Sequence, residues 1–254
     1  LGSRREMERW IELGRVGIDG VIARLGDRVQ EGQRIEVDGR PLVTDSGQAP
    51  RCLLYHKPTG EVCSRKDPEG RRTVFERLPK VASGRWISIG RLDYNTSGLL
   101  LFTTDGELAN ALTHPSANIE REYLVRVLGE VTDEQLDAMR EGVLLDDGLA
   151  RFTDIQPGGG DGVNRWFYVV LMEGRNREVR RLWESQGLTV SRLKRVRYGE
   201  LFIPSKVKKG QWIELTGADV VTLYRMAGLP PRVPGALSPQ EKRRQKRREG
   251  KRSA

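Results

Sequence analysis

The sequence predicts an α+β fold in which a mixed, mainly antiparallel sheet is flanked by helices. From Arg51 onwards, short apolar runs of strand length alternate with amphipathic helical stretches. The spacing lacks the regularity of repeated βαβ units, which argues against a doubly wound parallel sheet. The 254 residues are sufficient for one large or two modest hydrophobic cores.

Residues 1–48 are predicted to form a small separate module. Ser3 and Glu6 have the spacing of a capping box at a helix start, and Gly14 is placed to end that helix. Alternating apolar residues then run into Asp19-Gly20, a strong hairpin signal, and a second Asp-Gly turn follows. We therefore expect one helix followed by short strands.

In the central part of the chain, six strands and two clear helices are expected. The strands are predicted at residues 52–55, 86–89, 99–102, 123–127, 166–172 and 211–215. The helices are predicted at 133–142, opened by Thr132, and at 177–186, closed by Gly187. The glycine-rich stretch 158–162 is expected to be a flexible loop.

The segments that flank this central part are polar or basic. Residues 41–50 contain little apolar surface and are expected to be a linker. Residues 238–254 contain eight Lys or Arg against two Glu, and they carry most of the net charge of +9. We expect a disordered basic tail that adds salt-sensitive affinity for phosphate. The predicted domains are therefore 1–48, 49–228 and a tail at 229–254.

Composition narrows the class of protein. No apolar run approaches the length of a membrane span and no leader opens the sequence, so a cytoplasmic protein is expected. Cys52 and Cys63 are interpreted as free buried thiols, and two cysteines and two histidines scattered along the chain do not form a zinc site. We expect no metal and no cofactor. Because the first residue is Leu1, the natural N-terminus is expected to lie upstream.

The most informative segment is 90–101, which places the carboxylate of Asp93 in a polar turn ahead of an apolar strand. Alone, such an Asp is most simply a turn-capping residue. Three further segments are unusual: a basic turn at 56–60, a strand opened by Tyr123, and an Arg-rich helix at 173–183. Each also has a structural explanation, as a turn, as strand packing or as a solvated helix face.

In combination and order, these motifs resemble the pseudouridine synthases, in the branch that is typified by the A-type enzyme of the small ribosomal subunit and carries an N-terminal S4 domain. The family pattern Gly-Arg-Leu-Asp-x-x-Thr-x-Gly-Leu-Leu-Leu is matched from Gly90. The Lys-Pro-x-Gly turn, the Arg-Glu-Tyr strand, the Asn-Arg-x-Val-Arg-Arg helix and Leu-Lys-Arg at 193–195 follow in family order. The resemblance covers about residues 2–228, and 66–75 are most similar to the B-type enzymes of the large ribosomal subunit. The first helix of the family's S4 domain would precede Leu1.

The resemblance implies that Asp93 is the catalytic aspartate, that Tyr123 stacks on the target base, and that Arg180 pairs with the catalytic carboxylate. It implies isomerisation of a uridine in 23S rRNA by base flipping, N-glycosidic cleavage and reattachment through C5. Whether Asp93 attacks C1′ or removes the 2′ proton stays open. The residues expected to contact RNA are Arg4, Arg5, Arg15, Lys57, Arg91, Arg177 and Arg195.

Two alternatives stay open beside this hypothesis. One is a related synthase that acts on another rRNA site, and the other is a non-catalytic rRNA-binding or ribosome-assembly protein with the same fold. A metal-dependent nuclease is disfavoured, because Asp146-Asp147 precedes Gly148 in an expected surface turn. The partner is expected to be 23S rRNA, as a stem-loop or assembly intermediate, without membrane contact, and the protein is expected to be a monomer.

Overall fold

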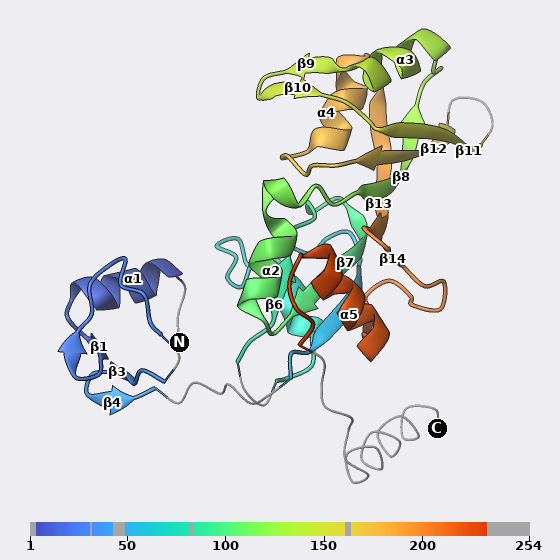
Figure 1. The fold of residues 1–254 in the computed structure, drawn as a ribbon. Helices are drawn as coiled ribbons and strands as arrows, with labels where there is room; N and C mark the ends of the chain where they lie inside the picture. Colours follow the sequence, from blue (N-terminus) through green and yellow to red (C-terminus); the bar gives the residue numbers. More distant parts are fainter. Residues whose placement is uncertain (1–3, 31, 43–48, 82–83, 161–163, 233–254) are drawn as a thin grey trace, which may run out of the picture. The chain divides into compact units, whose positions relative to one another are not determined.

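The computed structural model describes residues 4–30, 32–42, 49–81, 84–160 and 164–232. Contacts within the chain divide it into two units, Leu1–Gln48 and Ala49–Ala254 (Figure 1). Ser3 of the expected capping box lies outside the described residues, as do most of the expected linker and most of the basic tail. No helix in the described ranges is long and apolar enough to cross a membrane.

The first unit combines one helix with a small sheet. Helix α1 (Arg4–Glu12) is followed by four strands in the sheet order β2-β1-β3-β4, with bounds β1 (Val16–Ile18), β2 (Val21–Ile22), β3 (Ile35–Val37) and β4 (Arg40–Pro41). Asp19-Gly20 and Asp38-Gly39 all have positive φ, as two-residue type I′ hairpin turns require. The expected hairpin is confirmed. Pro41, the first residue of the expected linker, belongs to β4. Proline is tolerated there because β4 is an edge strand.

The second unit is built on a nine-stranded mixed sheet, as expected. Its main order is β11-β12-β8-β13-β7-β5-β15, with β14 on β13 and β6 on β7. Among the strand pairs that the structure describes in this sheet, β13 and β7 are parallel, and the other pairs are antiparallel. The strands are β5 (Cys52–Lys57), β6 (Ile87–Ile89), β7 (Ser97–Thr103), β8 (Arg121–Leu128), β11 (Asp154–Gly159), β12 (Asn164–Leu171), β13 (Thr189–Tyr198), β14 (Leu201–Phe202) and β15 (Trp212–Glu214).

A hydrophobic core lies on each face of this sheet, because side chains alternate along its central strands. On β7, Leu100 and Phe102 enter one core, whereas Leu99 and Leu101 enter the other. Burial on both faces explains the continuous apolar sequence of β7. The first core is covered by α3 (Asp133–Glu141) and α4 (Glu178–Ser185), and the second by α2 (Gly106–Thr113) and α5 (Gly217–Met226) (Figure 1).

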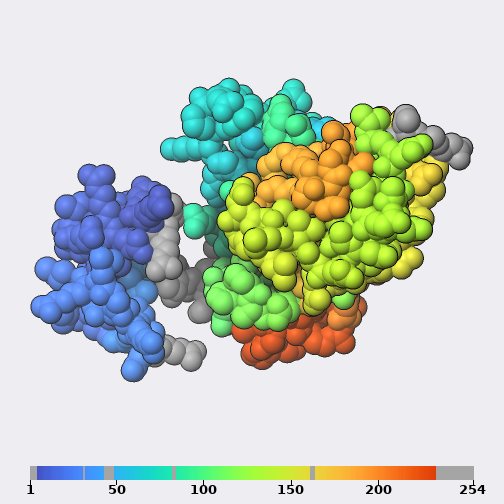
Figure 2. All heavy atoms as spheres, turned by 90° about the horizontal axis from the view of Figure 1, so that it is seen from above, coloured from blue at the N-terminus to red at the C-terminus, as the bar shows by residue number. Residues whose placement is uncertain are grey.

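Helices α3 and α4 lie where the sequence predicts them. The Thr132 hydroxyl caps α3 by accepting from the Gln135 amide, and Gly142 ends the helix. Beside α4 lies a two-stranded hairpin, β9 (Val143–Leu145) and β10 (Gly148–Ala150), seen in Figure 2 as yellow-green atoms next to the orange atoms of α4. Its turn contains Asp146-Asp147, as expected. Two short 3₁₀ helices, η1 (Val74–Arg77) and η2 (Pro115–Ala117), complete the unit.

Three local expectations need correction. Gly158 and Gly159, expected in a flexible loop, belong to β11, where a bulge preserves pairing with β12. Cys63, expected to be buried in a strand like Cys52, is only partly buried and lies outside the strands. At the predicted start of the tail, Leu229 packs against the second core and Arg232 Nη2 donates to Glu107 at 2.8 Å.

Candidate active site

The loop that carries Asp93 joins β6 to β7 and is held through hydrogen bonds to its backbone carbonyls. Each carbonyl oxygen from residue 92 to residue 96 accepts a hydrogen bond. The donors are Cys63 Sγ to Leu92 (3.3 Å), Lys57 Nζ to Asp93 (3.0 Å) and to Thr96 (2.9 Å), the Gly60 amide to Tyr94 (2.9 Å) and Arg180 Nη2 to Asn95 (3.1 Å). The half-buried Asp93 carboxylate has no hydrogen-bond or ion-pair partner in the described part of the chain, so a ligand can reach an unpaired carboxylate at a fixed position.

Lys57 does not face solvent, and its expected contact with RNA is wrong. Every residue of β5 is buried, and Lys57 has no exposed surface. Its ammonium donates to the carbonyls of Pro58, Asp93 and Thr96 at 2.9 to 3.1 Å. Burial lowers the pKa of Lys57, and the nearby carboxylates of Glu61 and Asp93 oppose the shift. Lys57 therefore positions the loop from beneath.

Arg180 was expected to pair with Asp93 directly. Its guanidinium instead donates to two carbonyls, Val190 through Nη1 at 2.9 Å and Asn95 through Nη2 at 3.1 Å. Burial lowers the pKa of Arg180, and the neighbouring charge of Asp93 opposes that shift. The Arg180 guanidinium and the Asp93 carboxylate are thus near enough to interact through their charges. In place of the expected direct bond to Asp93, Arg180 bonds the backbone of the same loop at Asn95.

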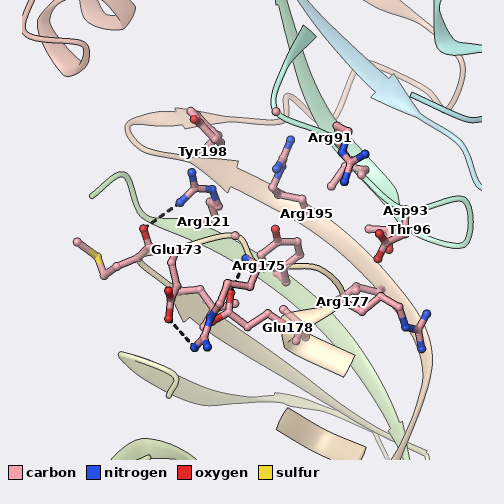
Figure 3. A pocket seen from close by; sticks show the side chains of 18 of the residues that line it. Arg91, Asp93, Thr96, Arg121, Glu173, Arg175, Arg177, Glu178, Arg195 and Tyr198 are labelled. Carbon is pink, nitrogen blue, oxygen red and sulfur yellow. Dashed lines mark hydrogen bonds and ion pairs between the residues drawn. The ribbon is translucent and has the colours of Figure 1, made fainter. Parts of the chain in front are cut away.

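Asp93 and Tyr123 line the same cavity, which has a volume of about 380 Å³. Tyr123 lies on β8 and is 8% exposed. Figure 3 shows Asp93 and Thr96 on the loop at one side, with Arg195 and Tyr198 on strand β13. The cavity is large enough for a nucleoside, and it combines a buried aromatic with a carboxylate.

The cavity is rich in arginine, and these arginines differ in exposure. Arg91 is exposed at the rim, and Arg177 is exposed in an ion pair of 3.3 Å with Glu184. Arg195 is only 2% exposed. All three line the cavity, and their contact with RNA stays a prediction; Arg195 is accessible only to a group that enters the cavity.

The arginines expected to bind RNA in the first unit are less uniform. Arg5 is exposed on α1. Arg15 donates from two nitrogens to the Asp38 carboxylate, and its guanidinium carbon lies 4.4 Å from the centre of the Trp10 ring. The contacts that Arg15 makes in the structure are therefore with residues of its own unit. Arg4 begins α1.

Glu178 is a cavity residue that was not among the predicted site residues. It is 2% exposed and accepts hydrogen bonds from the Arg175 amide at 3.0 Å and from Arg175 Nε at 3.2 Å. Burial, reinforced by Glu173, raises the pKa of Glu178 to about 7. The available signal was a single Glu at the start of an Arg-rich helix.

Arg175 also connects the cavity wall to the β9–β10 hairpin. Its Nη2 donates to the Leu149 carbonyl at 2.7 Å, and its Nη1 lies 3.1 Å from Asp147 Oδ1. Arg181 donates to both carboxylate oxygens of Asp147 at 2.8 Å. The carboxylate that the nuclease alternative required is thus occupied by two arginines, and it stabilises the hairpin.

Comparison with known proteins gives evidence that is independent of this geometry. Residues 51–185 match the family model of RNA pseudouridylate synthase, and residues 1–35 match the S4 domain. The chain is 57% identical over 233 residues to ribosomal large subunit pseudouridine synthase B of Vibrio vulnificus, covering 91% of this chain and 73% of that protein. It is 54% identical over 247 residues to the protein of the same name from Escherichia coli K12, covering 96% and 85%. A crystal structure of a pseudouridylate synthase aligns with a TM-score of 0.61 at 26% identity, covering 87% of this chain and 94% of the other.

Proposed function

Because the chain belongs to the RNA pseudouridylate synthase family, we propose that it converts one specific uridine of 23S rRNA to pseudouridine. The relatives named large subunit pseudouridine synthase B support this choice of RNA. The observation that carries the proposal is the unpaired carboxylate of Asp93 in the cavity that Tyr123 also lines. Five bonded carbonyls fix the loop on which this carboxylate stands.

The reaction begins when the target uridine leaves the RNA stack, at a cost of a few kcal/mol. In the cavity, the Tyr123 ring stacks on the base, a contact worth about 1–3 kcal/mol that does not depend on base identity. The Asp93 carboxylate acts on the ribose, either as a nucleophile at C1′ or as a base at the 2′ position. Arg180 holds the loop that presents this carboxylate by donating to the Asn95 carbonyl.

The bonds of the isomerisation then balance within one nucleotide. The C1′–N1 bond breaks and its electron pair leaves with the uracil. The uracil turns, C5 forms a bond to C1′, C5 loses its proton, and N1 gains one. The product is an isomer of the substrate, so the reaction needs no electron donor and no group donor.

Binding of the flanking RNA belongs to surfaces outside the cavity. We assign backbone contacts to the S4-like first unit and to the exposed Arg91 and Arg177 at the rim. The substrate is a stem-loop or an assembly intermediate, and shape and phosphate contacts suit such an RNA. We include in the proposal that the enzyme acts as a monomer, in the cytoplasm where ribosomes are assembled.

Asp93→Asn is the test of this proposal. The variant should bind a 23S rRNA transcript as tightly as the unchanged protein and should form no pseudouridine. Asp146→Asn, an exposed carboxylate in the β9–β10 turn, is the matched control and should retain full activity. Pseudouridine is mapped by sequencing the transcript after each reaction. Product formation by Asp93→Asn at the normal rate would refute the catalytic role.

Mapping rRNA from cells that lack this protein tests the choice of RNA. One 23S uridine should remain unmodified in those cells. If every 23S pseudouridine persists and a site in another rRNA is lost, the related synthase is the correct alternative. If no site is lost and the purified protein makes no product, the non-catalytic binding protein is correct.

A further inference from the structure

Arg195 lies between the two strands that carry the site. In the sheet register, its Cα is paired with Tyr123 on β8 and with Gly98 on β7. Directly opposed residues of an antiparallel pair point to the same face, so Arg195 and Tyr123 share a face of the sheet. Both line the cavity that contains Asp93. Figure 3 shows Arg195 and Asp93 among the residues of this cavity.

The guanidinium of Arg195 is held in place, but not all of its hydrogen-bond donors have an acceptor. Its Nε donates to the Leu99 carbonyl at 2.8 Å, and its central carbon lies 5.3 Å from the centre of the Tyr198 ring. Its Nη2 is enclosed and has no acceptor among the residues that the structure describes. A buried charged donor without an acceptor is costly, and mutational data place such a loss at about 1–3 kcal/mol or more. Arg195 lines the cavity, so a group that enters the cavity can contact this guanidinium.

The segment that presents Asp93 also fixes the backbone of Arg195. Gly98 has φ +112°, and a Cβ at this position would lie 2.2 Å from the Arg195 carbonyl oxygen and 2.6 Å from its amide nitrogen. Glycine is therefore required for β13 to approach β7 this closely. The position of the guanidinium relative to Asp93 is set by backbone packing before any ligand enters.

The other arginines of the cavity are occupied or exposed. Arg175 bonds the carboxylate of Glu178, and Arg121 Nη1 donates to the carbonyls of Ile119 and Met172 at 2.8 and 2.9 Å. Arg91 and Arg177 are exposed at the rim. Among the described cavity residues, Arg195 is thus the deeply buried arginine with an unused terminal nitrogen.

We propose that Arg195 stabilises the uracil anion that leaves C1′, by donating from a terminal guanidinium nitrogen to a carbonyl oxygen of the base. This inference rests on the proposed function. When the C1′–N1 bond breaks, its electron pair goes to the uracil, and the negative charge spreads over N1, O2 and O4. A fixed positive charge beside this anion lowers the barrier to its departure. A preorganised donor of this kind contributes about 10²- to 10³-fold to a rate.

Fluorine on the leaving base provides the test. A 5-fluorouracil anion is less basic than uracil, so its departure depends less on an external donor. The substrate is a synthetic RNA hairpin around the uridine mapped as described above, with either uridine or 5-fluorouridine at that one position. Under single-turnover conditions, loss of the original nucleoside is measured by mass spectrometry after nuclease digestion. The variants are Arg195→Lys and, as a matched control, Arg192→Lys, an exposed residue on the same strand.

Arg195→Lys should lower the rate on uridine RNA by about 100-fold and the rate on 5-fluorouridine RNA by about 10-fold or less. The ratio of the two rates therefore shifts by about tenfold or more, and it does not depend on the fraction of folded enzyme. Arg192→Lys should leave both rates unchanged. If Arg195→Lys lowers both rates equally, or only weakens RNA binding, the residue is structural or binds RNA and the inference is overturned. Failure of the unchanged protein to act on either RNA would instead refute the proposed function.

Discussion

Lys57→Met tests whether the position of Asp93 depends on the buried ammonium. Methionine retains an unbranched apolar stem and removes the charged donor. The change deletes three hydrogen bonds of 2.9 to 3.1 Å, two of which hold the loop at Asp93 and Thr96. Hydrogen bonds to charged groups contribute about 1.5–3 kcal/mol each, but the variant no longer buries a charge. We expect a net loss of about 2–3 kcal/mol in the free energy of unfolding.

The effect on the reaction should exceed the effect on binding. A displacement of about 1 Å in a catalytic group can lower a rate by 10²-fold. Lys57→Met should therefore reduce the single-turnover rate by about 100-fold, with RNA affinity within twofold of the unchanged protein. Stability is measured by urea denaturation, the rate by tritium release from RNA carrying 5-tritiated uridine, and affinity by filter binding. Lys66→Met, at an exposed lysine, is the control and should alter none of the three.

One result would contradict this account of Lys57. If the variant bound RNA at least tenfold more weakly and kept its rate at saturating RNA, Lys57 would contact the substrate, as the sequence motif alone suggested. The buried ammonium would then have no role in holding the loop.

Two further predictions concern close packing and pH. Gly98→Ala should lower the free energy of unfolding by more than about 4 kcal/mol, because its Cβ would lie 2.2 Å from the Arg195 carbonyl oxygen. The control is Gly90→Ala, which also has positive φ but has open space around the added Cβ, and it should cost about 1 kcal/mol. Equal losses of stability in urea denaturation would contradict the packing argument. The pKa of Glu178 is raised from 4.5 to about 7 in the folded protein, so the native state favours its protonated form, and its contribution to stability is lost as pH rises between these two values. Relative to the unchanged protein, Glu178→Gln should therefore gain up to about 3 kcal/mol between pH 5 and pH 8, and a difference constant with pH would refute the shift.

Much of the fold could be predicted because its signals are local. The Asp-Gly turns of the first unit, the Thr132 cap of α3 and the apolar runs of the central strands act over a few residues each. The bulged glycines of β11 could not be predicted in this way, because their pairing depends on β12, whose strand supplies the partners.

The sequence by itself determined the family, the loop that carries Asp93 and the aromatic residue Tyr123 that lines the same cavity, because these follow from motifs of fixed spacing. The tertiary structure decided what each basic residue does. Lys57 lies beneath the loop, Arg180 bonds a backbone carbonyl, and Arg195 is buried beside Tyr123. A basic side chain has the same local sequence signal whether it meets RNA or a buried carbonyl. Its role depends on which distant strand covers it, and only the folded sheet determines that.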